Sequence, residues 1–413
     1  HDRVEFLFHS DHDKPREISV STAFPEDRRD GRVQFKPFHE TYRVVSFGLA
    51  LGMMYPNPAT EKKRFICISI ILVSDVTNIT RHLAIIIPFL VVMCKIYLMY
   101  HNRQKLKRII DEIDRDHALY NSSPENYRAI IKKEIDSNLR GEKLWALNAT
   151  VATYHQVDCI FPIMSLTLNL YSSMFETVSK KHMIHDVNHP FKPPERRTES
   201  PYFETMMVYE TYCCIIFTLN FLGYDGSFGV AINHACLKMK LYCKSLEDAL
   251  LEKDRDVMFM KIVQVICEQC RVFRLMEEIQ DTFNVWLGII FLGTIIHISN
   301  CLFLEGTGFD LRFFIFAVGA VIHIYLPCRY NFAPSQSQDA ATLIYCSGWE
   351  NVQDQGIRKL ILFMIARSQV PLIITAFNIV TFDMELFVSV SIPELCLLLC
   401  IYITQALVKR LSL

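Results

Sequence analysis

The sequence has 413 residues, of which 51% are hydrophobic and 21% are charged, and its formal net charge is -1. A charge this close to zero gives neither a basic field for nucleic acid nor an acidic field for cationic partners, so neither partner is expected. The charged residues gather between long apolar runs. This distribution is typical of an integral membrane protein, in which each helix that crosses the roughly 30 Å hydrocarbon core needs about 20 apolar residues.

Apolar windows predict an all-α integral membrane protein with seven transmembrane helices. The first 40 residues are charged and contain no apolar segment of a cleavable signal peptide, so the first span is expected to direct insertion. Two shorter apolar stretches, Val44–Pro56 and Ile357–Thr375, predict partly inserted or cytoplasmic helices that end near prolines. The seven windows cover residues 63–80, 82–101, 144–170, 203–226, 282–303, 311–329 and 384–408.

The loops between the windows alternate in lysine and arginine content. Residues 101–143 contain ten of these side chains and residues 237–274 contain eight, whereas residues 78–82 and 304–312 contain one each. Because such residues are retained on the cytoplasmic side, the N-terminus is predicted to be cytoplasmic and the C-terminus extracellular. This orientation is the reverse of that of a G-protein-coupled receptor.

The spans are predicted to extend into a cytoplasmic helical bundle. The segments Lys105–Asp116, Tyr127–Leu139 and Leu246–Glu278 carry apolar residues at helical spacing among mixed charges. Their apolar stripes need partners, either between subunits or within the chain. The stripes comprise Ile130, Ile131, Ile135 and Leu139 in the second segment, and Met258, Ile262, Val265 and Val272 in the third. The chain would then divide into an N-terminal segment, 1–62, a region with spans one to six, 63–329, and a cytoplasmic helix with the last span, 330–413.

The 14 cysteines are scattered singly, mostly within apolar runs, and therefore predict small apolar side chains rather than a disulfide framework. Cys267 and Cys270 form one CxxC motif, without a second pair or a histidine at zinc spacing, so we interpret both as core residues. His155, His297 and His323 lie inside spans, but their spacing does not favour a metal site. No nucleophile elbow, phosphate loop or paired metal motif is present, so neither enzyme chemistry nor a cofactor is predicted.

Motifs in the last third of the chain resemble the insect odorant receptor family. Tyr345 and Trp349 precede a cytoplasmic helix, an arginine-serine-glutamine-x-proline turn follows at Arg367–Pro371, and the last span is entered through Phe387. Leu51–Pro56 is similar to the family's entry to the first span. Ser200–Glu210 is similar to the start of the fourth.

The resemblance implies a tetrameric, odorant-gated, nonselective cation channel. The last span departs from the family by carrying Pro393–Cys396 in place of a serine-tyrosine run, or of the threonine-tyrosine-phenylalanine motif of the shared co-receptor. This departure favours a ligand-tuning subunit rather than the co-receptor. The partners implied are a small volatile organic ligand, a co-receptor subunit in a heterotetramer, and membrane lipid. The location implied is the plasma membrane of a sensory neuron dendrite.

The resemblance places the pore along the last span, where a polar face and a hydrophobic constriction are needed. A carboxylate at bilayer depth costs roughly 2.5–3.5 kcal/mol on insertion scales, so Glu394 is expected either to face the pore or to form an ion pair or hydrogen bond with a neighbouring helix. Pro393 is expected to kink the helix. The pore-lining residues predicted are Glu394, Leu395, Leu398 and Tyr402.

The resemblance also implies a ligand pocket in the outer half of the membrane between spans two, three, four and six. Its predicted lining is mostly apolar and aromatic, which suits a small, weakly polar molecule, although each of these residues could instead pack a helix interface. The residues predicted are Ile86, Phe89, Tyr154, Cys159, Phe161, Met206, Tyr209, Phe313 and Phe314.

Three other classes of protein remain as alternatives. A gustatory-type channel shares the superfold, but its terminal tyrosine and glutamine-phenylalanine pattern is absent. A G-protein-coupled receptor needs the opposite orientation and an aspartate-arginine-tyrosine motif after the third span. A transporter is expected to have repeated halves with broken helices, and the sequence has no such symmetry.

Overall fold

The computed structural model describes residues 35–46, 76–156, 160–175, 199–205, 207–208, 211, 221–307, 311–330 and 333–390. These residues are almost entirely helical, as the apolar windows predict. The elements are α1 (Phe38–Thr41), α3 (Val76–Tyr120), α4 (Glu125–Gln156), α5 (Ile160–Phe175), the π-helix η2 (Phe221–Asp225), α7 (Gly226–Leu250), α8 (Arg255–Thr307), α9 (Leu311–Tyr330), α10 (Ala333–Tyr345), the 3-10 helix η3 (Trp349–Asn351), α11 (Gln355–Gln369), β1 (Thr375–Ala376) and β2 (Val380–Thr381).

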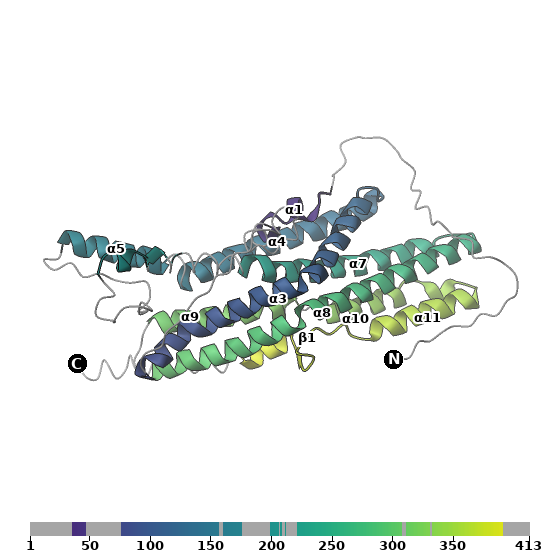
Figure 1. Ribbon diagram of the computed structural model, residues 1–413. Coiled ribbons are helices and arrows are strands. Elements are labelled where there is room, and N and C mark those ends of the chain that lie inside the picture. The colour runs from purple at the N-terminus through teal and green to yellow at the C-terminus, as the bar shows by residue number, and fades with distance from the viewer. Residues whose placement is uncertain are drawn as a thin grey trace, which may run out of the picture. The chain divides into compact units, whose positions relative to one another are not determined.

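Two long helices, α3 and α8, form the centre of the fold and run side by side (Figure 1). Each joins a predicted span to a predicted cytoplasmic segment without a break: α3 has 45 residues and α8 has 53. Helices α7 and α9 also pack on α8, each along a different part of its length. In these two elements a predicted span and a predicted cytoplasmic segment thus form one continuous helix.

The segment Leu246–Glu278 is not one helix, and this part of the prediction is wrong. Helix α7 ends at Leu250, and α8 begins at Arg255. Asp254 accounts for the break, because its carboxylate accepts hydrogen bonds from the backbone N–H groups of Asp256, at 2.8 Å, and Val257, at 3.4 Å. Such an N-cap satisfies donors that a continuous helix would otherwise use.

The apolar stripes of the predicted cytoplasmic helices are buried within this chain. Ile131 on α4 and Ile262 and Val272 on α8 have exposed fractions of 0%. They belong to clusters that join α3, α4, α7 and α8. Helices α10 and α11 pack against each other, α10 also contacts α7, and α11 also contacts α8. An intrachain bundle therefore accounts for these stripes.

The N-terminal segment 35–46, which includes α1, is tied to α3 and α4 by side chains that bind its backbone. Asn121 Nδ2 donates to the Phe35 carbonyl at 3.0 Å, and His117 Nδ1 donates to the carbonyl of Lys36 at 2.8 Å. Glu142 of α4 accepts a hydrogen bond from the Val45 N–H at 3.0 Å. Polar side chains of α3, α4 and the turn between them thus replace the backbone partners that this short segment lacks.

Among the described residues, one helix is long and apolar enough to cross a membrane. It is the stretch Arg255–Leu302 within α8, and a shorter apolar stretch, Ala317–Arg329, lies in α9. Each overlaps a predicted span, 282–303 in α8 and 311–329 in α9. The seven-span count, the orientation of the termini and the three-part division of the chain stay predictions.

Candidate functional site

Three ionisable side chains meet inside the helical bundle, within three predicted spans. Lys95 comes from α3, Asp225 ends η2, and His323 comes from α9. The Lys95 ammonium forms an ion pair with Asp225 Oδ1, and His323 Nε2 lies 3.3 Å from Asp225 Oδ2. The side chains of Lys95 and Asp225 are each only 1% exposed. One carboxylate therefore joins three helices that are distant in sequence. We call these residues the charged centre.

Aromatic side chains surround the charged centre. Tyr224, Phe283 and Trp286 pack with ring centroids 4.9–5.7 Å apart, and Phe228 completes the group. The Lys95 ammonium lies 5.7 Å from the centroid of the Trp286 ring. Removing an unpaired charge from water costs several kcal/mol. In these apolar surroundings, Lys95 and Asp225 can therefore both stay charged only because they pair with each other.

The π-helix η2 brings Asp225 to this position. A π-helix turn inserts an extra residue, shifts the side chains that follow, and is often found at functional sites. Here it ends at Asp225, immediately before α7 begins at Gly226. Lys95 and Asp225 were missed by sequence reasoning, although each is a charged residue inside an apolar window. Such charges are by default candidates for function.

The described backbone places six of the predicted ligand-binding residues in helices. Ile86 and Phe89 lie in α3, Tyr154 in α4 and Phe161 in α5. Helix α9 contains Phe313 and Phe314. Helix α4 packs against α9, and both α3 and α9 pack against α8. These contacts bring together three of the elements that the prediction requires, while the lining itself stays a prediction.

The remaining predicted site residues lie outside the described residues. In the pocket these are Cys159, Met206 and Tyr209. All four predicted pore residues lie beyond residue 390, where the description of the last helix ends, namely Glu394, Leu395, Leu398 and Tyr402. The assignment of the pore therefore stays a prediction.

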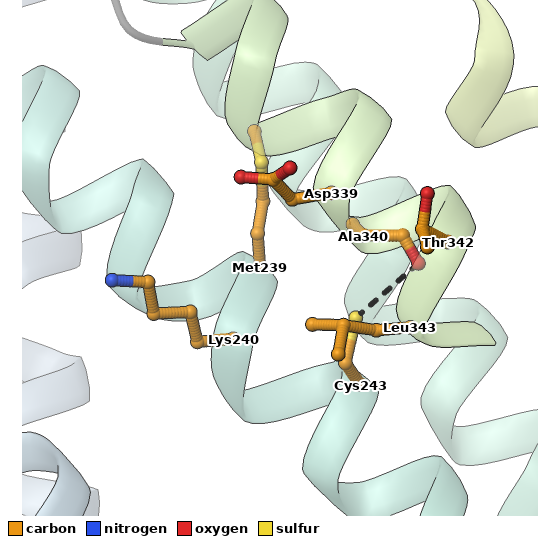
Figure 2. A pocket seen from close by; sticks show the side chains of 7 residues that line it. All are labelled: Met239, Lys240, Cys243, Asp339, Ala340, Thr342 and Leu343. Atoms are coloured by element: carbon orange, nitrogen blue, oxygen red, sulfur yellow. Dashed lines mark hydrogen bonds between the residues drawn. The ribbon is translucent and has the colours of Figure 1, made fainter. Parts of the chain in front are cut away.

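A shallow cavity of about 440 Å³ lies between α7 and α10, within predicted cytoplasmic segments rather than at the predicted ligand pocket (Figure 2). Cys243 points from α7 toward α10, where its thiol donates to the Ala340 carbonyl at 3.8 Å, whereas the Lys240 side chain lines the cavity but extends away from α10. Burial raises the pKa of Cys243 to about 12, so the group stays a thiol. Lys240 pairs with Glu134 of α4 at 2.9 Å. Neither group is activated for chemistry.

The structure separates the histidines and cysteines that the sequence singled out. His297 is buried, with Nε2 3.8 Å from Cys301 Sγ. Cys267 and Cys270 are exposed on α8, so their interpretation as core residues is wrong. Cys236, Cys301 and Cys328 are buried as expected. Across the described ranges, no group of three or more histidine, cysteine or carboxylate side chains could hold a metal ion.

Comparison with known proteins identifies the family. The sequence profile described as 7tm Odorant receptor matches residues 75–391, which is more than half of the chain. The chain belongs to the 7tm odorant receptor family. The resemblance drawn from the motifs is thus confirmed, and with it the expectation that the protein is a membrane receptor and not an enzyme. Membership does not separate ligand-tuning subunits from the co-receptor.

Solved odorant receptor structures share the fold. The chain is similar to the insect olfactory receptor OR5 from Machilis hrabei in complex with eugenol, with a TM-score of 0.63, 16% identity and coverage of 88% of each chain. A second structure of that receptor matches with a TM-score of 0.62, 15% identity and coverage of 87% of this chain and 85% of that one. No curated protein matches the sequence.

Proposed function

We propose that this odorant receptor is the ligand-tuning subunit of a ligand-gated, nonselective cation channel in the plasma membrane of a sensory neuron dendrite. A small, weakly polar volatile binds in the outer half of the membrane and favours the open arrangement of the last helices. The carrying observation is the family match over residues 75–391, together with the shared fold. A co-receptor subunit completes the heterotetramer.

The distribution of side chains in the predicted spans supports a lipid environment. Tyr97 on α3, Leu170 on α5 and Ile296 on α8 are more than half exposed, at 66%, 54% and 55%. Lys95 and Asp225, by contrast, are buried. Large apolar side chains outside and charges inside are the pattern expected where lipid replaces water around the helices.

The opening mechanism requires only that the ligand bind the open state more tightly than the closed state. The predicted lining contains phenylalanine, tyrosine and isoleucine, which hold a small ligand mainly by shape and dispersion contacts, and the tyrosine hydroxyl can add a hydrogen bond. The predicted Glu394 would supply the carboxylate that draws cations to the pore. The orientation proposed has a cytoplasmic N-terminus and seven spans.

The proposal is tested by voltage clamp of cells that express the chain with and without the co-receptor, while a panel of small volatiles is applied. The expected result is a rapid inward cation current that needs both subunits and persists when G-protein signalling is blocked. Current that disappears under that block would contradict the channel proposal. So would absence of current when labelling confirms both subunits at the cell surface and the panel is broad.

Substitutions then separate the pocket from the pore. Phe89→Ala is expected to raise the odorant concentration for half-maximal current, with Leu90→Ala as the neighbouring control, because Leu90 is 54% exposed. Glu394→Gln is expected to change cation permeability while leaving that concentration unchanged, because a pore carboxylate acts on the ion. If Glu394→Gln leaves permeability unchanged, Glu394 instead pairs with a neighbouring helix.

A further inference from the structure

The connection between α11 and the last helix is a short β-hairpin that needs external support. Strand β1 pairs with β2 through Thr375 opposite Thr381 and Ala376 opposite Val380. A hairpin of two residues per strand is not stable alone in water. The surroundings that fix this hairpin therefore decide where the last helix begins.

Two side-chain amides of α8 bind the hairpin backbone. Gln280 Nε2 donates to the Thr375 carbonyl at 3.0 Å, and Gln280 Oε1 accepts from the Thr375 N–H at 3.0 Å. Asn284 Oδ1 accepts from the Asn378 N–H at 2.9 Å, and Asn284 Nδ2 donates to Asn378 Oδ1 at 2.9 Å. Gln280 and Asn284 are four residues apart, so they lie on one face of α8. Each amide therefore supplies hydrogen bonds that the two short strands cannot supply to each other.

The same face of α8 continues with a glycine that accommodates the hairpin turn. Phe377 and Asn378 both have left-handed backbone conformations, with φ of 52° and 57°, as in the turns that join tight hairpins. A Cβ on Gly288 would overlap the Phe377 ring, so only glycine leaves room for it. The Phe377 N–H also donates to the Asn284 carbonyl at 3.4 Å. Gly288 thus allows the ring of a strained residue to pack on α8.

The end of the hairpin is joined directly to the last helix. Phe382 is fully buried and packs edge-on against Phe291 of α8, with centroids 6.4 Å apart. The Asp383 carboxylate then accepts from the Leu386 N–H at 2.8 Å and caps the helix that begins at residue 384. Phe387 packs against Tyr325 of α9, with centroids 5.2 Å apart. The start of the last helix is therefore fixed against both α8 and α9.

We propose that Gln280, Asn284 and Gly288 are positioning residues that hold the start of the last helix on α8 in both the closed and the open channel. We call these three residues with the hairpin the α8 clamp. The inference rests on the proposed function, because it concerns the helix that would line the pore. The α8 clamp would confine the opening movement, relative to α8, to the part of the last helix beyond Asp383.

The first experiment measures the clamp without conduction, by hydrogen exchange of residues 374–382 in the purified full-length receptor. Gln280→Ala/Asn284→Ala is expected to accelerate exchange in this segment while leaving α3 protected. Gln264→Ala, an exposed amide elsewhere on α8, is the control and is expected to change nothing. Unchanged exchange in the double variant would show that these amides do not hold the hairpin.

The second experiment asks whether the clamp moves when the channel opens. Asn284→Cys/Asn378→Cys is joined by oxidation or a short thiol cross-linker during voltage clamp, with Asn284→Cys alone treated identically. We expect the bridged channel to keep its odorant-evoked current. At equal surface density, Gln280→Ala/Asn284→Ala is expected to lose about tenfold, a size typical of coupling between sites.

The outcomes distinguish this inference from the proposed function. Block of current by the cross-link, but not in the single-cysteine control, would show that the clamp opens during gating and would overturn the inference. Full current in Gln280→Ala/Asn284→Ala would overturn it as well. If the wild-type receptor with the co-receptor conducts nothing, the channel proposal fails, while hydrogen exchange still reports whether the clamp exists.

Discussion

Neutralising Asp225 is expected to destabilise the receptor more than any surface charge change. Asp225→Asn keeps the size of the side chain but removes the charge that pairs with Lys95, in a site where both side chains are 1% exposed. Removing one partner of a buried ion pair costs about 3–5 kcal/mol. Because folded proteins are stable by about 5–15 kcal/mol, this loss is a large share of the total. We therefore expect a clearly lower midpoint of thermal unfolding for the detergent-extracted, fluorescently tagged receptor, and less of it at the cell surface.

A matched control separates this effect from loss of charge in general. Lys244 pairs with Glu247 at 3.1 Å on α7, but its side chain is 31% exposed. Lys244→Met is expected to cost under about 1 kcal/mol, since water and salt screen such pairs. Lys95→Met/Asp225→Asn removes both charges and is expected to cost less than the sum of its single substitutions. The reasoning is refuted if Asp225→Asn unfolds at the same temperature as Lys244→Met, or if the double variant is simply additive.

Three further predictions concern the described bundle. Burial lowers the pKa of His117 below 6.5, so the fold disfavours the charged form of this side chain. Protonation at low pH therefore favours the unfolded segment. The protection of residues 35–46 against hydrogen exchange should be complete above about pH 6.5 and decline as the pH falls below that value. His117→Asn, which can keep a donor for the Lys36 carbonyl, should remove that pH dependence, and an unchanged decline would assign it to another group. Ile131→Ala is expected to cost about 2–5 kcal/mol in stability because Ile131 is fully buried, and the half-buried Ile130 should cost less when changed in the same way; equal unfolding midpoints would contradict this. Alkylation followed by mass spectrometry should label the exposed Cys267 well before Cys243, whose pKa is about 12, and the reverse order would show that the α7–α10 contact opens.

Helical periodicity predicted much of the bundle, because residues that recur every three or four positions must share one face. Ile131, Ile262 and Val272 were identified as buried in this way and have no exposed surface. Helix α11 also ends at Gln369, before Pro371, as the missing backbone donor of proline requires. These outcomes depend only on the spacing of apolar residues and prolines along the chain, which can be determined from the sequence alone.

The failures depend on competition or on distant contacts. Apolar spacing continues through residues 246–278. The Asp254 carboxylate, however, accepts a hydrogen bond from the Asp256 N–H and so starts a new helix. Cys267 was interpreted as a core residue because its CxxC motif lacks further zinc ligands, yet it is exposed on α8. The cost of burying Lys95 could be inferred from its apolar window, whereas its partner, 130 positions later at Asp225, could be found only once the helices were packed.

The length of α8 gives the charged centre and the α8 clamp a common mechanical basis. At 1.5 Å per residue, its 53 residues extend about 80 Å, of which a hydrocarbon core roughly 30 Å thick covers less than half. Trp286 beside the charged centre and Gln280 in the clamp are less than two turns apart on this helix. A displacement of α8 at one of these sites therefore reaches the other through a single hydrogen-bonded element, because no break in α8 lies between them. Ligand-driven movement of the helices around Asp225 would thus carry the α8 clamp along with α8 as one body, and the last helix would change its position relative to α8 only beyond Asp383.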